Sequence, residues 1–402
     1  MSDWLRNPAN IIPLIIGAIL GAVLENILEL IINMFKSVFS RIGFSWQRRG
    51  IWKSPHPNRP RIYIATDINY SAKDILIEAP LDLLENQGFL FGWLKTQDYI
   101  PIYGTGIVSY PKIRCIHDPT NVFTPPNELK KLFAATVKEL KAQATAKNQP
   151  FEPRPKARLL GAIPSIEIND ELIIKTGYAN YHQYRASQEL LLRDRLHELK
   201  DNQGRSLELR SRFNVMSRSY DSPIVCGVLG VEITLITSDD KVVIVKRNKT
   251  EAQLQNLFLA TIGEGIEPVH DKKETLDNST LLLDPFHTVV RGAKEELGID
   301  IAPNGIKFFA LGIHKATMDP DLLGVLKVPH TQNDLEYSIL SARARDRWES
   351  NNLQFIDFNP KSVSQFIKLV GIDHMTPAAP ICLIFSLLTF FPEKQVIKAF
   401  TN

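Results

Sequence analysis

The first 36 residues have a hydrophobic pattern unlike that of the rest of the chain. From Ile11 the sequence reads IIPLIIGAILGAVLENILELIINMF, and the first 14 of these residues carry no charge. A helix needs about 20 mostly apolar residues to cross the hydrocarbon of a bilayer, so residues 1–36 are predicted to form one transmembrane helix. Because the start of the chain is not basic and the run continues past Ala22, we expect an uncleaved anchor rather than an export signal.

Small and polar residues recur at every fourth position of this segment, at Gly17, Gly21, Glu25 and Glu29. A Gly-x-x-x-Gly pattern lets two helices approach closely in lipid, and ionisable groups at membrane depth usually face a bundle interior or water. One interpretation is a self-associating helix in a homo-oligomer, even one that lines a pore. The other is a plain anchor whose last turns, from Glu25 onward, lie in the interface.

Basic residues follow the apolar run, whereas only Arg6 precedes it. Residues 37–60 form a basic juxtamembrane linker in this interpretation. Positive charge next to a membrane segment favours the cytoplasmic side, so we expect a single-pass protein of the inner (cell) membrane with its C-terminal bulk in the cytoplasm. The residues that carry this asymmetry are Lys36, Arg41, Arg48, Arg49 and Lys53.

Residues 61–221 alternate between strand and helix patterns. Residues 61–66 and 165–177 have the apolar, β-branched composition of strands, and residues 127–147 and 182–199 have the periodicity of helices. Residues 148–158 contain three prolines among charges, which indicates a linker. We find no repeat and no nucleotide-binding motif here, so this mixed α/β region has no role that its sequence assigns.

Residues 222–402 have sharper patterns. Two strand-like runs between residues 224 and 248 flank a tight turn at residues 238–240, and further strands are expected at residues 257–262, 306–313 and 322–328. The closing apolar run at residues 377–391 is barely long enough to span a membrane. We expect it to be a packed terminal helix.

The segment from Val289 to Asp300 reads VVRGAKEELGID and lies in a predicted helix from Pro285 to Leu297. Asp284 is a good N-cap and Pro285 suits the first helical position. The adjacent acids Glu295 and Glu296, both expected to be exposed, oppose the helix dipole at a small cost. Carboxylates in this position, facing a glycine-rich loop, are suited to a hard divalent cation that holds a substrate's phosphates.

These residues resemble the Nudix box, whose family form is Gly, five residues, Glu, seven residues, then Arg-Glu-U-x-Glu-Glu-x-Gly-U, with U a bulky aliphatic. The resemblance covers residues 222–372, including the first hairpin and the glycines of TIGEGIEP at residues 261–268. The box positions that match are Arg291, Glu295, Glu296, Gly298 and Ile299, with Ala293 as a small apolar stand-in.

The resemblance implies a Nudix-like α/β/α sandwich that cleaves a nucleoside diphosphate linked to another moiety, with water attacking a phosphorus. It implies that Glu295 and Glu296 hold Mg²⁺ or Mn²⁺ and that Arg291 belongs with them to the catalytic set. The glycines Gly263 and Gly265 would form the cofactor-binding opening of the box.

Two departures from the family form affect this site. An insertion lies between Gly265 and the helix, so the first Glu of the box has no unambiguous counterpart, and Asp284 is the nearest acid. Gly292 stands where the family has the Glu after the arginine, on the same helix face as Glu295 and Glu296. Fewer carboxylates should weaken metal binding. The alternative is that both glutamates are ordinary solvated acids and Arg291 pairs with Glu295.

Composition excludes some classes of partner. The net charge is +3, from 47 basic and 44 acidic residues, so the basic footprint of a protein that binds a nucleic-acid polymer is missing. Cys115, Cys226 and Cys382 have neither paired nor metal-ligand spacing, which argues against disulfides and a zinc site and favours a reducing compartment.

A membrane helix joined to a Nudix-like domain resembles the transmembrane Nudix effectors of bacterial CBASS-type anti-phage signalling. The resemblance implies a nucleotide-sensing effector that binds a nucleotide or cyclic oligonucleotide and then disrupts the membrane. The alternative is a Mg²⁺-dependent hydrolase of a nucleoside diphosphate-linked substrate. A third hypothesis makes the middle region the sensor and the Nudix-like domain the output enzyme.

Overall fold

The computed structural model divides the chain into two compact units, Met1–Arg59 and Pro60–Asn402. All described residues lie in the second unit: 113–147, 149–161, 172–201, 203–215, 220–247, 257–275, 280–314, 317–341, 352–371, 374–376 and 378–401, with short strands within 63–109. The predicted transmembrane helix and the basic linker are outside these residues. Among the residues that are described, no helix combines the length and apolarity that a membrane crossing needs.

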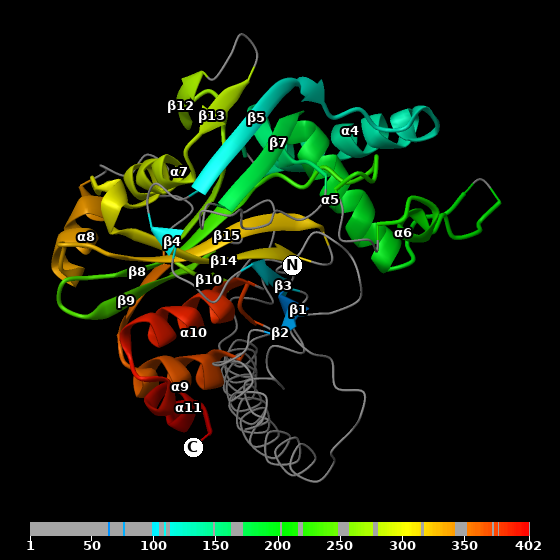
Figure 1. Cartoon of the computed structure of the whole chain (residues 1–402). Helices are drawn as coiled ribbons and strands as arrows, with labels where there is room; N and C mark the ends of the chain where they lie inside the picture. Colours follow the sequence, from blue (N-terminus) through cyan, green and yellow to red (C-terminus); the bar gives the residue numbers. More distant parts are fainter. Residues whose placement is uncertain are drawn as a thin grey trace, which may run out of the picture. The chain divides into compact units, whose positions relative to one another are not determined.

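The larger of the two main sheets has nine strands and confirms a mixed α/β fold (Figure 1). Its centre is a parallel pair, β8 (Gly230–Ile236) and β15 (Asp319–Lys327), and β15 continues antiparallel to β14 (Ile306–His314). The predicted hairpin is present, because β8 pairs with β9 (Lys241–Lys246) across residues 237–240. The other strands are β10 (Phe258–Leu259), β11 (Ile262–Gly265), β16 (Asn352–Asp357), β3 (Tyr99–Tyr103) and β4 (Val108–Ser109).

The smaller sheet has five strands and joins the two halves of the sequence. β5 (Ile113–Val122) and β7 (Leu172–Asn180) run parallel at its centre, and β6 (Pro155–Leu159) borders β7. Its other edge is the hairpin of β12 (Lys272–Thr275) and β13 (Leu281–Leu283), which lies between Gly265 and Asp284 in the sequence. Each region on either side of residue 221 therefore contributes strands to the sheet of the other. β13 pairs with β5 in the smaller sheet, and β3 and β4 pair with β14 in the larger one. β1 (Tyr63–Ile64) and β2 (Ile75–Leu76) form a separate pair.

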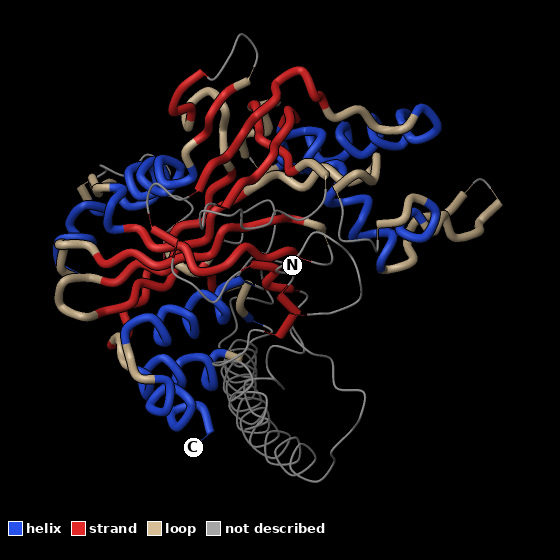
Figure 2. Tube along the Cα trace, viewed as in Figure 1, coloured by secondary structure: helices blue, strands red, loops and turns tan. Residues whose placement is uncertain are grey.

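Helices cover both faces of the nine-stranded sheet (Figures 1 and 2). On one face α7 (Pro285–Gly292) packs against β11 and β8, and its Phe286 and Val289 belong to the same buried cluster as Val231 and Ile233 of β8. On the other face α9 (Pro360–Val370), α10 (Ala378–Phe390) and α11 (Glu393–Thr401) bury a second apolar cluster, so the closing run is a packed helix, as predicted. The remaining helices are α4 (Lys130–Ala146), α5 (Tyr181–Arg195), α6 (Leu209–Arg212) and α8 (Gln332–Leu340).

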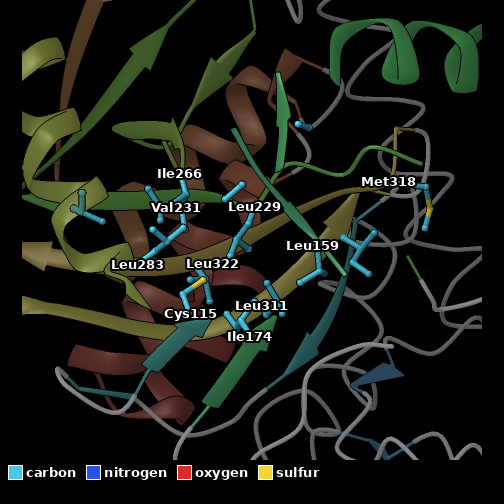
Figure 3. Packing of buried hydrophobic residues seen from close by; sticks show 14 of the residues in the cluster. Cys115, Leu159, Ile174, Leu229, Val231, Ile266, Leu283, Leu311, Met318 and Leu322 are labelled. Atoms are coloured by element: carbon cyan, nitrogen blue, oxygen red, sulfur yellow. The ribbon is translucent and has the colours of Figure 1, made fainter. Parts of the chain in front are cut away.

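One apolar cluster connects the two main sheets. Figure 3 shows Cys115, Ile174 and Leu283 of the smaller sheet packed with Val231 and Leu322 of the larger one, all of them almost completely buried. Burial of apolar surface contributes roughly 25 cal/mol per Å², so this shared core fixes the smaller sheet against the strands that carry the candidate site. Cys115, Cys226 and Cys382 are buried, each with a free thiol.

Candidate functional site

The helix that carries the box begins at a well-formed cap. The Asp284 carboxylate accepts a hydrogen bond from the backbone N–H of Phe286 (3.0 Å), and Pro285 occupies the first turn, as predicted. Asp284 directly follows β13, and its own N–H donates to the carbonyl of Asp271 at 2.8 Å. Asp284 is therefore committed to the start of α7 and does not serve as the first acid of the box.

The predicted single helix has two parts. The regular turns of α7 end at Gly292, and residues Ala293–Leu297 form a π-helical segment before Gly298 turns left-handed at φ 71°. A π segment is wider than the α-helix and changes which side chains face inward. The prediction that both glutamates are exposed is wrong for Glu296, which is only 6% exposed; the side chain of Glu295 is half-buried.

Arg291 is the centre of the site. Its Nε donates to Asp271 Oδ1 (3.2 Å), and its Nη2 donates to Asp271 Oδ2 (3.2 Å) and to the carbonyl of Gly265 (3.0 Å). Its Nη1 donates to Glu264 Oε2 (3.1 Å) and to Glu295 Oε2 (3.2 Å). A guanidinium has five N–H donors, and these five bonds use all of them. Arg291 is thus a structural cation that joins a strand, a loop and a helix.

Asp271 is a site residue that the sequence analysis missed. Its carboxylate is completely buried, and besides holding Arg291 it accepts from the backbone N–H of Glu267 at 2.8 Å. It stands six positions after Gly265, the spacing that the box requires of its first acid. The insertion therefore lies after this acid, as the β12–β13 hairpin, and counting forward from Gly265 would have found Asp271.

A second missed residue comes from the middle region. Lys156 on β6 forms a buried ion pair with Glu267, at 2.6 Å between Nζ and Oε1. Burial raises the pKa of the Glu267 carboxyl, but the nearby cations, Lys156 foremost and Arg291 with it, outweigh burial and hold that pKa below its usual range. No pattern near the box indicates Lys156, because it lies 111 residues before its partner.

The two opening glycines of the box point away from α7. Side chains alternate along β11, so Ile262 and Glu264 face the helix while Gly263 and Gly265 face the other side. Gly265 still reaches the site through its carbonyl, which Arg291 binds. Gly263 is exposed, and a Cβ built on it would lie 3.4 Å from Glu232 Oε2. The structure thus brings Gly265, but not Gly263, to Arg291, which also binds Glu295.

The charges of the site are strongly coupled. Burial lowers the pKa of Arg291, whereas the carboxylates of Glu264 and Asp271 raise it. The net shift is upward, so the guanidinium stays charged. Burial raises the pKa of Glu264, against the attraction of Arg291. Each partner therefore depends on the other: without the guanidinium these carboxylates would be buried charges without compensation.

The side chains around Arg291 do not fit a divalent cation in this arrangement. Glu264, Asp271 and Glu295 all direct an oxygen at the guanidinium. Among the described residues, no three carboxylate, imidazole or thiolate side chains converge closely enough to hold a metal ion. The cation at the centre of this site is Arg291, and no metal-dependent step follows from the geometry.

Comparisons with known proteins give only distant similarities. No known family matches the chain and no curated protein does. Among solved structures, a protein of Deinococcus radiodurans is 13% identical over 35% of this chain and 73% of its own, with a TM-score of 0.24. A MutT/nudix family protein of Enterococcus faecalis is 14% identical over 42% of this chain and 55% of its own, with a TM-score of 0.23. Similarities at this level carry no functional inference, so the function has to come from the site residues.

Replacing Asp271 should destabilise the protein far more than replacing Glu295. Asp271→Asn leaves a buried guanidinium short of its principal partner, which costs about 3–5 kcal/mol. Glu295→Gln removes a partly exposed partner and should cost about 1 kcal/mol or less. Urea unfolding of both variants measures the difference. Equal losses would show that Arg291 is not organised around Asp271.

The partly buried acid Glu232, beside Gly263, should make stability depend on pH. Burial raises the pKa of Glu232 from 4.5 to about 7, although Arg247 opposes the shift. The folded protein therefore keeps a proton that the unfolded chain releases, and stability falls as the pH rises from 4.5 to about 7.

Glu232→Gln should remove this cost and raise the free energy of unfolding by about 1–3 kcal/mol at pH 8, with no gain near pH 4. Exposed Glu198→Gln is the matched control and should show no such trend. Unfolding curves at several pH values give the measurement. A gain that is the same at pH 4 and pH 8 would mean that Glu232 is ionised throughout.

Proposed function

We propose that the chain is a membrane-attached, Nudix-like protein that binds a nucleotide without rapid hydrolysis and disrupts the membrane when it is liganded. The observation that carries this proposal is the closed ion cluster around Arg291. All five N–H donors are used within the protein, and Glu264, Asp271 and Glu295 are bound to the same guanidinium. Because these carboxylates are bound to the guanidinium, the arrangement argues against metal-assisted turnover.

The order and geometry of the box residues support the Nudix-like part of the proposal. Gly265 ends strand β11, Asp271 follows after five residues, and Arg291, Glu295 and Glu296 lie on the helix that packs on that strand. The arginine binds both the opening glycine and the first acid, so residues that the box places far apart in sequence meet in one cluster.

The membrane part of the proposal rests on the sequence pattern of residues 1–36 and on the resemblance to anti-phage effectors. The ligand would be a cyclic oligonucleotide or another nucleotide, bound on the cytoplasmic side. The small residues Gly17 and Gly21 would let the membrane helices associate in a homo-oligomer, where Glu25 and Glu29 are sheltered from lipid.

A Mg²⁺-dependent hydrolase is the second candidate, and the charge of the site favours it. Five carboxylates lie around two basic groups, Lys156 and Arg291. The site therefore has three more formal negative charges than positive ones, and a bound divalent cation would reduce this excess. In this hypothesis the cluster rearranges when metal and substrate bind together. The five acids are Glu264, Glu267, Asp271, Glu295 and Glu296.

Ligand binding and turnover can be measured on one sample of the full chain purified in detergent. Cyclic dinucleotides, cyclic trinucleotides, ADP-ribose and ATP are each added with and without Mg²⁺. We expect one of them to raise the melting temperature, by mass action on the folded state, while the nucleotide is recovered intact. Multiple turnovers that require Mg²⁺ would instead establish the hydrolase.

Membrane disruption should require both the ligand and the association of the membrane helices. Vesicles that contain the full chain and a trapped dye should leak only when the stabilising nucleotide is added. The double variant Gly17→Ile with Gly21→Ile keeps the apolar length of the helix but blocks close packing. It should abolish leakage while nucleotide binding persists. Leakage that is independent of every nucleotide, or unchanged in the double variant, would contradict the effector mechanism.

A further inference from the structure

The helix surface at Gly292 is occupied by a strand. A Cβ built on Gly292 would lie 2.7 Å from Cγ2 of Ile262 and 2.8 Å from Cγ of Glu264, both on β11. Contacts this short are not tolerated, so any side chain at this position displaces the strand or one of its residues. Gly292 is buried, and its bare backbone is what lets β11 approach α7.

The side chain that fills this space is itself an acid. Glu264 passes over Gly292, and its Oε2 accepts a hydrogen bond from Arg291 Nη1 at 3.1 Å. The same nitrogen donates to Glu295 Oε2 at 3.2 Å, so Glu264 and Glu295 share the NH₂ group of Arg291 Nη1. Glu296 Oε1 is 3.6 Å from the Cβ position of Gly292, which brings a third carboxylate to the same place.

We propose that Glu264 supplies from the strand the carboxylate that the helix lacks at Gly292, and that this exchange makes Arg291, rather than a divalent cation, the centre of charge in the site. Glu264 is a positioning residue, because it acts by holding Arg291. The proposal rests on the Nudix-like interpretation of the helix. In this interpretation Gly292 is not simply the loss of a metal ligand, because the carboxylate absent at position 292 is present at position 264.

The position of the acid explains its effect. Successive residues of a helix point in directions about 100° apart, so an acid at position 292 would diverge from Arg291. Glu264 faces Arg291 from the strand that packs on the helix, and its Oε2 accepts a hydrogen bond from Arg291 Nη1. Without Glu264 this N–H would be directed at solvent or a ligand. With that bond made, the guanidinium has no free donor.

A double-mutant cycle tests the steric half of the pair. Gly292→Ala should raise the unfolding equilibrium constant of the full chain, because the new methyl group meets Glu264 Cγ. In a Glu264→Ala background that atom is gone, and the increase should be smaller by about fivefold or more, an interaction free energy of ~1 kcal/mol. Ile262 is present in every background and cancels from the comparison.

The matched control is Glu264→Gln, which keeps Cγ and removes the charge. Gly292→Ala should be as harmful in this background as in the natural sequence. If Gly292→Ala has the same effect with Glu, Gln and Ala at position 264, the two positions are independent and the proposal fails. Nucleotide binding is measured separately, so a failed cycle does not by itself remove the proposed function.

Mn²⁺ binding tests the charge half. Free Mn²⁺ is followed by electron paramagnetic resonance in titrations of the natural chain, Glu264→Gly with Gly292→Glu, and Glu264→Gly alone. The exchanged variant places three acids on the helix and should bind Mn²⁺ at least about tenfold more tightly than the other two. Tight binding by the natural chain that is lost in Glu295→Gln would overturn the proposal, whether or not the exchanged variant folds.

Discussion

The guanidinium of Arg291 is the interaction on which the candidate site depends. It binds the strand through Glu264 and Gly265, the following loop through Asp271, and its own helix through Glu295. Because these groups are largely buried, each needs the others: removing one leaves an uncompensated charge or an unsatisfied donor in a region of low dielectric. The conformation of the box is therefore cooperative and fixed by ion pairing.

The five-stranded sheet extends this constraint into the middle region. Asp271 and Asp284, the residues at the two ends of the inserted hairpin, are hydrogen-bonded through their backbones, and the hairpin itself pairs with β5. From the other side Lys156 binds Glu267 inside the same loop. A displacement of the smaller sheet would change both ends of the box loop, which gives the middle region a physical route to influence the site.

Local features of the sequence predicted local structure well. The hairpin around residues 238–240, the cap at Asp284 and the closing apolar helix each depend on neighbouring residues, and each is present. What could not be predicted depends on distant partners or on a change of helix type. The π segment buries Glu296, and Glu264 reaches Arg291 from a strand 27 residues away in sequence. A helix pattern contains no sign of either effect.

The central claim is that an arginine, and not a metal ion, is the cation at the centre of this site. Anomalous diffraction from crystals of the full chain grown with Mn²⁺ tests it most directly. The account predicts no anomalous peak beside Glu295 and Glu296, with Arg291 still bound to Glu264 and Asp271. A peak within coordination distance of these glutamates, with Arg291 turned away from Glu264, would contradict it.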